Sequence, residues 1–401
     1  MTTTSERRAA TLALAGLDDT LQPFGLSTML PAQAYTSDEV FAWEQRHLYA
    51  GTYTCVGRES ELRSAGADHR LLTQRAVRVG DVHVLLTWSG EGAGRVQAFA
   101  NTCRHRAHEL VEADGGNSRQ SIICPYHAWT YDLSGALRAA PGYQAVPGFD
   151  PSQHGLVALP VHRWHGWLFV HAATSLESGQ ALPFEVFIGE LEGLVAPYDP
   201  TALVLGDRHS YVVEANWKVI AENYHECYHC PLIHPELCQV TPPSSGENLD
   251  LSGAWLGGTM ELRDGMQTMS LSGESDGRPL PGVSPTTVLY AGLLPNLLIS
   301  AHPDYVMTHR LVPLAPGRTW VECSWYFPDT GDEAPIDPSY AVEFWDLTNK
   351  QDWHACESVQ RGLASPHFRA GPFSPSEDAV HMFATTIARA YRGLPIHEPA
   401  G

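Results

Sequence analysis

The stretches NTCRHRAHEL, at residues 101–110, and IICPYHAW, at residues 122–129, decide how the rest of the chain is interpreted. They contain two pairs of metal-binding residues, Cys-x-His and Cys-x-x-His, with eighteen residues between them: Cys103 and His105, then Cys124 and His127. A [2Fe–2S] cluster with two thiolates on one iron and two imidazoles on the other takes one Cys and one His from each of two loops. The four residues are therefore predicted to bind such a cluster, which a reduced ferredoxin or flavoprotein could supply with electrons.

A zinc ion is the alternative for the same four residues, since Cys₂His₂ coordination is also common in structural zinc sites. The identity of the four ligands alone does not decide between a [2Fe–2S] cluster and a zinc ion. The surrounding sequence favours the cluster, because the ligands fall on turns between β-type segments and not on the hairpin and helix of a zinc finger. Pro125, Tyr126 and Trp129 also resemble the loop that covers the cluster in Rieske domains.

The bulk composition is that of an acidic enzyme with one large and one smaller core. The chain has 401 residues, of which 43% are hydrophobic and 17% charged, and its formal net charge is −20. This charge argues against a nucleic-acid partner. No apolar run is long enough to span a membrane, and Thr11 to Leu17 is too short for a secretory signal. We therefore expect a cytoplasmic protein that begins with a leader of about 17 residues. The eight cysteines of the chain are expected to need no disulfide.

Changes of hydrophobic period divide the chain into three parts. Residues 1–49 are expected to form a leader and, after the capping Ser37, a short amphipathic helix. Residues 50–155 read as short strands of a small all-β domain. Residues 156–401 are expected to form a larger domain with three main features, namely a helix capped by Asn216 that Pro231 stops, an antiparallel meander over 286–327, and a last long helix from Tyr340 to about Leu363.

A second candidate metal site lies in ENYHECYHCPLIHPEL, at residues 222–237. On the predicted helix Glu222, Glu226 and His229 share one face, and His234 follows Pro231. A mononuclear ferrous site needs two histidines and one carboxylate, with the other positions open. His229 and His234 are the predicted histidines. The third ligand must come from the C-terminal helix, where spacing does not choose among the four candidates Glu343, Asp346, Asp352 and Glu357.

Two other interpretations of this segment stay open. Cys227 and Cys230 are one helical turn apart, so these thiolates could bind zinc together with His229 and His234. The histidines could also be ordinary polar residues of a partly exposed helix. The density of His and Glu in this segment favours a metal, and iron over zinc.

With both motifs in place, nearly the whole chain resembles the α-subunits of Rieske ring-hydroxylating oxygenases. Glutamate at position 226, the ENYHECYHC text and the later WDLTNKQD resemble most the branch that acts on quaternary ammonium compounds, such as the glycine betaine, carnitine and stachydrine oxygenases. The resemblance implies Asp352 as the third iron ligand. It also implies that Glu226 bridges a cluster histidine of a neighbouring subunit to the iron.

The resemblance further implies an α+β fold, in which a small all-β Rieske [2Fe–2S] domain packs on a helix-grip domain, a curved antiparallel sheet around a long helix. It implies a homotrimer that receives electrons from NAD(P)H through a flavin and iron–sulfur reductase or a ferredoxin. With O₂ and Fe(II), the enzyme would hydroxylate a small organic substrate. Oxidative N-demethylation of a compound such as glycine betaine is expected, with aromatic hydroxylation as one alternative and a zinc-dependent structural protein as another.

Substrate contacts are left unassigned by the sequence. Aromatic side chains could form a cation–π cage, although strand aromatics are more often core residues. Arginines could bind a substrate carboxylate. The candidates weighed are Trp255, Tyr290, Tyr305, Trp320 and Trp325 for the cage, and Arg263 and Arg310 for the carboxylate.

Overall fold

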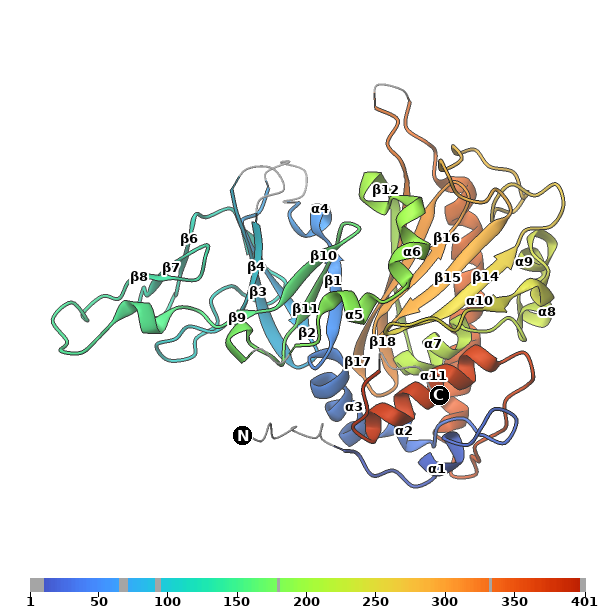
Figure 1. The fold of residues 1–401 in the computed structure, drawn as a ribbon, viewed down its shortest axis with the longest axis horizontal. Coiled ribbons are helices and arrows are strands. Elements are labelled where there is room, and N and C mark those ends of the chain that lie inside the picture. Colours follow the sequence, from blue (N-terminus) through green and yellow to red (C-terminus); the bar gives the residue numbers. More distant parts are fainter. Residues whose placement is uncertain (1–10, 65–70, 91–94, 179–180, 332–333, 397–401) are drawn as a thin grey trace, which may run out of the picture. The chain divides into compact units, whose positions relative to one another are not determined.

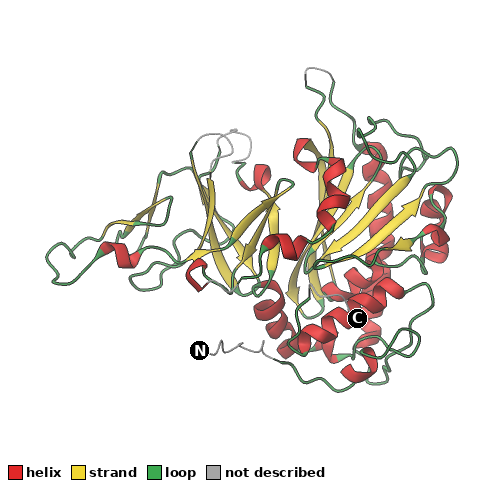
Figure 2. Cartoon of the chain, viewed as in Figure 1, coloured by secondary structure: helices red, strands yellow, loops and turns green. Residues whose placement is uncertain are grey.

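The computed structural model describes residues 11–64, 71–90, 95–178, 181–331 and 334–396. The chain divides into two compact units, each described here by itself (Figures 1 and 2). The small unit is Glu44–Phe184, and the large unit combines Met1–Trp43 with Glu185–Gly401. Helices and strands are both abundant, as the α+β prediction requires, and no helix of the described residues is long and apolar enough to cross a membrane.

The small unit consists of antiparallel sheets with the orders β5-β2-β3-β4-β9, β1-β11-β10 and β6-β7-β8. Val84 and Leu86 of β3 pack with Leu168 and Val170 of β11 in one apolar core, so the first two sheets are joined by side chains. The strands are β1 (Tyr53–Arg58), β2 (Gln74–Val79), β3 (Val82–Ser89), β4 (Arg95–Ala100), β5 (Gly116–Asn117), β6 (Ser121–Ile123), β7 (Thr130–Asp132), β8 (Leu137–Ala139), β9 (Ala158–Leu159), β10 (Val161–Trp164) and β11 (Trp167–His171).

The small unit extends beyond the expected range of 50–155. Strand β9 pairs with β4, where Ala98 faces Leu159, and β11 pairs with β1, where Cys55 faces Phe169. Sheet hydrogen bonds therefore tie residues 158–171 to the strands before the cluster loops. The sequence placed them in the following domain because a lone apolar strand does not reveal its partner.

The large unit is built on a seven-stranded antiparallel sheet with the order β12-β18-β17-β16-β15-β14-β13 (Figure 1). The expected meander corresponds to β15–β18, with turns at His302-Pro303-Asp304 and Ala315-Pro316-Gly317 as predicted. The strands are β12 (Leu203–Val213), β13 (Glu247–Asn248), β14 (Trp255–Glu261), β15 (Thr287–Leu293), β16 (Leu297–Ala301), β17 (Val306–Ala315) and β18 (Arg318–Pro328).

The long helix α10 (Ser339–Leu363) lies against one face of this sheet. Asn349 of α10 hydrogen-bonds His309 of β17 at 2.9 Å, and Asp346 accepts a hydrogen bond from Tyr211 of β12 at 2.6 Å. A curved sheet around a long helix is the helix-grip arrangement, so the predicted fold class is confirmed.

Shorter helices complete the two units. The large unit contains α1 (Leu17–Thr20), α2 (Gln33–Thr36), α6 (Leu191–Val195), α7 (Trp217–Tyr224), α8 (Cys230–Ile233), α9 (Pro235–Val240) and α11 (Asp378–Tyr391). Helices α3 (Asp38–Glu44) and α5 (Phe184–Ile188) lie at the division between the units, and α4 (Glu59–Leu62) belongs to the small one.

Two expectations about the termini need correction. The expected leader includes residues 1–10, which lie outside the described residues, but Leu12 and Leu17 are buried, so the end of that segment is part of the fold. Helix α11 follows the helix that was expected to be the last long one. Its apolar face is buried because Val380, Phe383 and Ile387 recur at helical spacing.

Candidate metal centres

The two predicted cluster loops have the same backbone turn. The amide of Ala107 donates to the carbonyl of Cys103 at 3.0 Å, and the amide of Ala128 donates to the carbonyl of Cys124 at 3.0 Å. Both alanines have a φ of 57°. Each loop thus bends back over its cysteine, and the histidine follows within the same turn, two residues after Cys103 and three after Cys124.

The four candidate ligands differ in exposure as a redox cluster requires. Cys103 and Cys124 are buried in a second apolar core of the small unit, which includes Phe99 and Tyr131, whereas His127 is exposed and His105 is half-buried. The two imidazole rings are 4.7 Å apart, and Trp129 stacks on His105 at 5.0 Å. Thiolates below and imidazoles at the surface suit a cluster that exchanges electrons through its histidine side.

The same four residues fit a binuclear cluster better than a zinc ion. A tetrahedral zinc ion, with bonds of about 2.0–2.3 Å, would draw all four ligand atoms to within roughly 4 Å of one another. Among the described residues, the group of three or more His, Cys, Asp or Glu ligand atoms that converge within 4.8 Å lies elsewhere. The four residues of the two loops are therefore not drawn together as closely as a single zinc ion would require.

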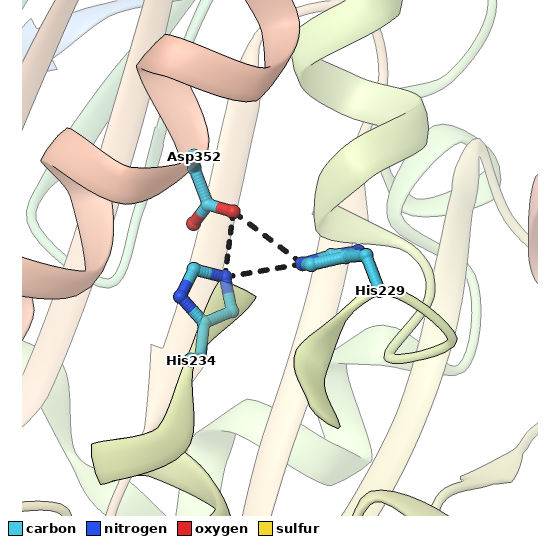
Figure 3. A group of neighbouring side chains, drawn as sticks. All are labelled: His229, His234 and Asp352. Carbon is cyan, nitrogen blue, oxygen red and sulfur yellow. Dashed lines mark hydrogen bonds and ion pairs between the residues drawn. The ribbon is translucent and has the colours of Figure 1, made fainter. Parts of the chain in front are cut away.

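That converging group consists of His229, His234 and Asp352 (Figure 3). Oδ1 of Asp352 lies 2.8 Å from Nε2 of His234 and 3.4 Å from Nε2 of His229, and the two Nε2 atoms are 3.1 Å apart. In Figure 3 the two rings and the carboxylate point toward one common position. Two imidazole nitrogens and one carboxylate oxygen are the donor set of a mononuclear ferrous site.

Glu226 and His229 do not continue the helix face of Glu222, which corrects the sequence interpretation. Helix α7 begins at the predicted cap, where Asn216 Oδ1 accepts the amide of Lys218, but it ends at Tyr224. The carboxylate of Glu226 accepts the backbone amides of Tyr228 and His229, and thereby replaces helical hydrogen bonds with a side-chain turn. Pro231 occupies the first turn of the next helix, α8, where its missing N–H costs nothing.

Neighbouring side chains fix the tautomers of both histidines. Glu226 Oε1 lies 2.5 Å from Nδ1 of His229, and Gln351 Oε1 lies 2.7 Å from Nδ1 of His234. Each acceptor holds the proton on Nδ1 and leaves the Nε2 lone pair for a metal. Gln351 was missed from the sequence, and its position beside Asp352 in α10 was the available signal.

The electrostatics of this group suit a cation. Burial alone would raise the pKa of Asp352, but the imidazoles of His229 and His234 outweigh it and hold that pKa below its usual range. Burial likewise opposes the charged form of His229, yet the carboxylates of Asp352 and Glu226 raise its pKa to about 9. The site therefore attracts positive charge, which a metal would supply in place of the proton.

The other candidates are engaged elsewhere. Asp346 pairs with Lys350 and Tyr211, and Glu222 accepts a hydrogen bond from Tyr35 at 2.6 Å. Cys227 and Cys230 form a disulfide, contrary to the expectation that no disulfide is needed. In that state neither sulfur is a thiolate, so the alternative zinc site through these two cysteines is not formed.

A cavity of about 470 Å³ opens beside the converging group. Its wall includes the aromatic side chains Tyr224, Tyr290, Trp345 and Trp353. Of the five aromatic residues weighed from the sequence, Tyr290 is the one that lines this cavity, since Trp255, Tyr305 and Trp325 are buried in the core and Trp320 packs under Arg310. Trp345 and Trp353 were missed, although they share a face of α10 with Asp352.

Two family models match the chain, one described as the Rieske [2Fe-2S] domain over residues 48–150 and one as the ring hydroxylating alpha subunit (catalytic domain) over residues 200–393. The chain belongs to the Rieske non-haem iron oxygenases, as the two motifs predicted. It is an iron-dependent oxidoreductase that uses a [2Fe–2S] cluster, a mononuclear iron and O₂, and a partner protein supplies its electrons from NAD(P)H.

Two curated relatives cover most of the chain. The chloroplastic choline monooxygenase of Beta vulgaris is 30% identical over 358 residues, which span 88% of this chain and 75% of that protein. The glycine betaine monooxygenase oxygenase subunit of Chromohalobacter salexigens is 29% identical over 380 residues, which span 86% of this chain and 81% of that protein.

Solved structures agree with this fold. The quaternary ammonium Rieske monooxygenase CntA, in complex with the inhibitor MMV12, matches with a TM-score of 0.74 and 25% identity over 97% of this chain and 100% of that chain. Naphthalene 1,2-dioxygenase from Rhodococcus sp. matches with a TM-score of 0.70 at 17% identity, over 94% of this chain and 96% of that chain. The latter likeness extends to the fold alone.

Proposed function

We propose that this chain is the terminal oxygenase component that oxidises a quaternary ammonium compound, with Cys103, His105, Cys124 and His127 binding the cluster, and His229, His234 and Asp352 binding the iron. The observation that carries the proposal is the convergence of these last three residues beside an aromatic-lined cavity. When bound, the cluster relays single electrons and the iron activates O₂.

The cavity supports an ammonium substrate by its chemistry. A quaternary nitrogen carries a permanent charge but has no N–H to donate, so aromatic faces are suitable partners for it. Tyr224 and Tyr290 lie with ring centroids 6.1 Å apart at 71°, and α10 adds Trp345 and Trp353 to the cavity wall. Relatives named for choline and glycine betaine agree with this substrate class.

The reaction that follows is oxidative N-demethylation. One oxygen atom of O₂ enters a methyl C–H bond, and the other leaves as water after taking up two electrons and two protons. The resulting carbinolamine breaks its C–N bond and releases formaldehyde, a proton and the tertiary amine. The protein's part is to hold the methyl group beside the iron and to exclude the bulk of the water.

Glu226 is proposed to connect the two centres. Its carboxylate hydrogen-bonds Nδ1 of His229, and in the proposed homotrimer its other side would meet a cluster histidine, His105 or His127, of a neighbouring subunit. A flavin and iron–sulfur reductase or a ferredoxin is the proposed donor. A cytoplasmic location remains part of the same proposal.

The test is turnover of the holoenzyme with its reductase and NADH. Quaternary ammonium compounds should give O₂ uptake coupled to formaldehyde, whereas small arenes should not give hydroxylated products. The Glu226→Gln variant should keep both metals and lose at least about tenfold in rate, because the bridging carboxylate is gone. Oxidation of arenes without oxidation of ammonium compounds would contradict the proposal, and an unchanged rate in Glu226→Gln would contradict the bridge.

A further inference from the structure

The charged side chains of the cavity wall indicate whether the end of the substrate opposite its ammonium group can carry a negative charge. Three carboxylates line the cavity, those of Glu226, Asp352 and Asp378. Among the described residues that line it there is no lysine or arginine. We infer, resting on the function proposed above, that the substrate is a quaternary ammonium monocation with an uncharged far end, such as an alcohol, and that zwitterionic betaines are discriminated against.

The remaining cavity histidines do not supply the missing positive charge. Burial lowers the pKa of His225 to about 4. Burial also lowers the pKa of His309, although its Nε2 hydrogen-bonds Oδ1 of Asn349 at 2.9 Å. Both rings are therefore neutral at physiological pH, while His229 and His234 are committed to the iron.

Basic residues on nearby elements are engaged away from the cavity. Arg310 donates to Glu322 at 3.1 Å and lies over the ring of Trp320 at 5.1 Å. Arg263 donates to the carbonyl of Cys238 at 2.9 Å. Neither of the two arginines weighed for a substrate carboxylate is therefore placed to bind one here.

Asp378 makes the cavity unfavourable for an anion. It is half-buried, accepts a hydrogen bond from Asn248 at 2.7 Å, and is the first residue of α11. A carboxylate in the first turn offsets the positive end of a helix, so α11 offers no net attraction to another one. A betaine carboxylate would therefore lose its water and meet like charge without a basic partner.

An uncharged far end fits the same surroundings. Ser244, Thr259 and Ser376 line the cavity, and their hydroxyl groups are of a kind that can exchange hydrogen bonds with an alcohol. The two carboxylates at the centre, Asp352 and Glu226, together offset the charge of ferrous iron. Asp378 is then left as the counter-charge for one ammonium group.

Choline and glycine betaine test the inference, because both carry a trimethylammonium group and differ in having an alcohol or a carboxylate. Their Kd values are measured by calorimetry on the resting holoenzyme, and their kcat/KM values by reductase-coupled turnover. We expect both measures to favour choline by at least about tenfold, which corresponds to a penalty of about 1.4 kcal/mol for the uncompensated carboxylate.

Variants that change the charge of residue 378 test whether the Asp378 carboxylate causes the preference for choline. Asp378→Asn should lower the ratio of kcat/KM for choline to kcat/KM for glycine betaine by at least about threefold, and Asp378→Lys should lower this ratio further. The matched control is Asp38→Asn, since Asp38 is also the first residue of a helix, α3, but is exposed and does not line the cavity. This control should leave the preference unchanged, and thermal unfolding checks that all variants fold.

The outcomes distinguish this inference from the proposed function. Oxidation of both compounds with equal or greater preference for glycine betaine overturns the inference and leaves the proposed function intact. An unchanged preference in both Asp378 variants also overturns it. If neither choline nor glycine betaine nor any other quaternary ammonium compound is oxidised, the proposed function is overturned, and the inference is overturned with it.

Discussion

Each proposed iron-binding histidine is oriented by one neighbouring side chain. Glu226 accepts a hydrogen bond from Nδ1 of His229, and Gln351 accepts one from Nδ1 of His234. Gln351 is itself held by Glu236, to which its amide donates at 3.3 Å. Because a wrong tautomer would turn a ligand nitrogen into an N–H group, these acceptors decide whether the site can bind a metal.

Replacing Gln351 by Leu should weaken iron binding. Removal of such an acceptor commonly costs about 10–100-fold in metal affinity, and we expect a loss in this range here. The measurement is iron retained per chain after dialysis against graded chelator, with the [2Fe–2S] absorbance as internal reference. Lys350→Gln is the matched control, since this exposed neighbour pairs with Asp346 outside the site. Equal iron retention in Gln351→Leu and the control would refute the role of Gln351.

Glu222 is expected to make stability depend on pH. Burial raises the pKa of Glu222 to about 7, against the opposing effects of the hydrogen bond from Tyr35 and the charge of Lys218. The folded state therefore keeps a proton that the unfolded chain releases near pH 4.5, so stability falls as the pH rises from 4.5 to 7.

The Glu222→Gln variant should remove this dependence. At pH 8 we expect the variant to be more stable than the parent protein by roughly 1–2 kcal/mol, a modest effect because Glu222 is only half-buried. At pH 4.5 we expect little difference in stability. Denaturant unfolding of the two proteins at both pH values measures this. A stability difference that does not change with pH would contradict the assignment.

At the residue scale, most of the proposed ligands stand in short motifs that the sequence shows directly. Cys103, His105, Cys124 and His127 stand in two short motifs, and His229 and His234 in a third. Asp352 was one of four equivalent carboxylates until the family resemblance selected it, because spacing along a helix does not reveal which face meets a distant loop. The wall residues Trp345 and Trp353 depend on the same face and were missed for the same reason.

The loop between α7 and α8 positions the first histidine. The disulfide between Cys227 and Cys230 closes a short ring that contains His229, and Glu226 caps the backbone amides on the same side. Cross-linking a loop this short restricts the unfolded chain modestly, by about 2 kcal/mol at most. Its larger effect should be on the position of His229.

Opening this ring should reduce iron retention more than it reduces stability. The Cys227→Ser/Cys230→Ser variant is expected to unfold at a slightly lower temperature and to lose its mononuclear iron several-fold faster to chelator. Peptide mapping without reductant should find the cross-linked peptide in the parent protein. Cys238→Ser, in the next helix but one, is the control for loss of a thiol. Identical iron loss in the double variant and the control would contradict the prediction.

At the element scale, regular patterns were predictable and local exceptions were not. The meander and α10 follow their hydrophobic periods, so their positions were predicted closely. Helix α7 ended before the sequence interpretation placed its end, because Glu226 uses its side chain to satisfy backbone amides. Helix α11 went unrecognised although its apolar residues recur at helical spacing, which was a missed signal and not a missing one.

At the scale of the whole molecule, the two centres lie in different compact units. The proposed cluster ligands belong to Glu44–Phe184, and the proposed iron ligands to the unit that includes Glu185–Gly401. A protein with both centres must bring an electron from one to the other. Under the proposed homotrimer, that transfer occurs between neighbouring subunits through Glu226.

Mixed assemblies test this route. His105→Ala should inactivate the cluster, and Asp352→Ala the iron site, so each variant alone should be inactive. Co-expression with two different tags, followed by purification through both, should give assemblies with measurable activity, because an intact cluster of one chain can serve an intact iron of the next. Verified mixed assemblies without activity would contradict transfer between subunits.

The division into a small all-β part and a larger α+β part was predictable because the hydrophobic period changes along the chain. The boundary was not, since β9–β11 look like a separate strand cluster until their pairing partners are known. The sequence also could not define the cavity, whose wall combines β14, β15, α7 and α10.

Single turnover of the chemically reduced holoenzyme tests the central claim most directly, because no reductase is present. On exposure to O₂ with a quaternary ammonium compound, the cluster should reoxidise while formaldehyde and demethylated amine form in proportion to the mononuclear iron, and Asp352→Ala should form neither product. Reoxidation of the cluster without any organic product, at full iron occupancy and across alcohol, betaine and alkyl ammonium compounds, would contradict the account.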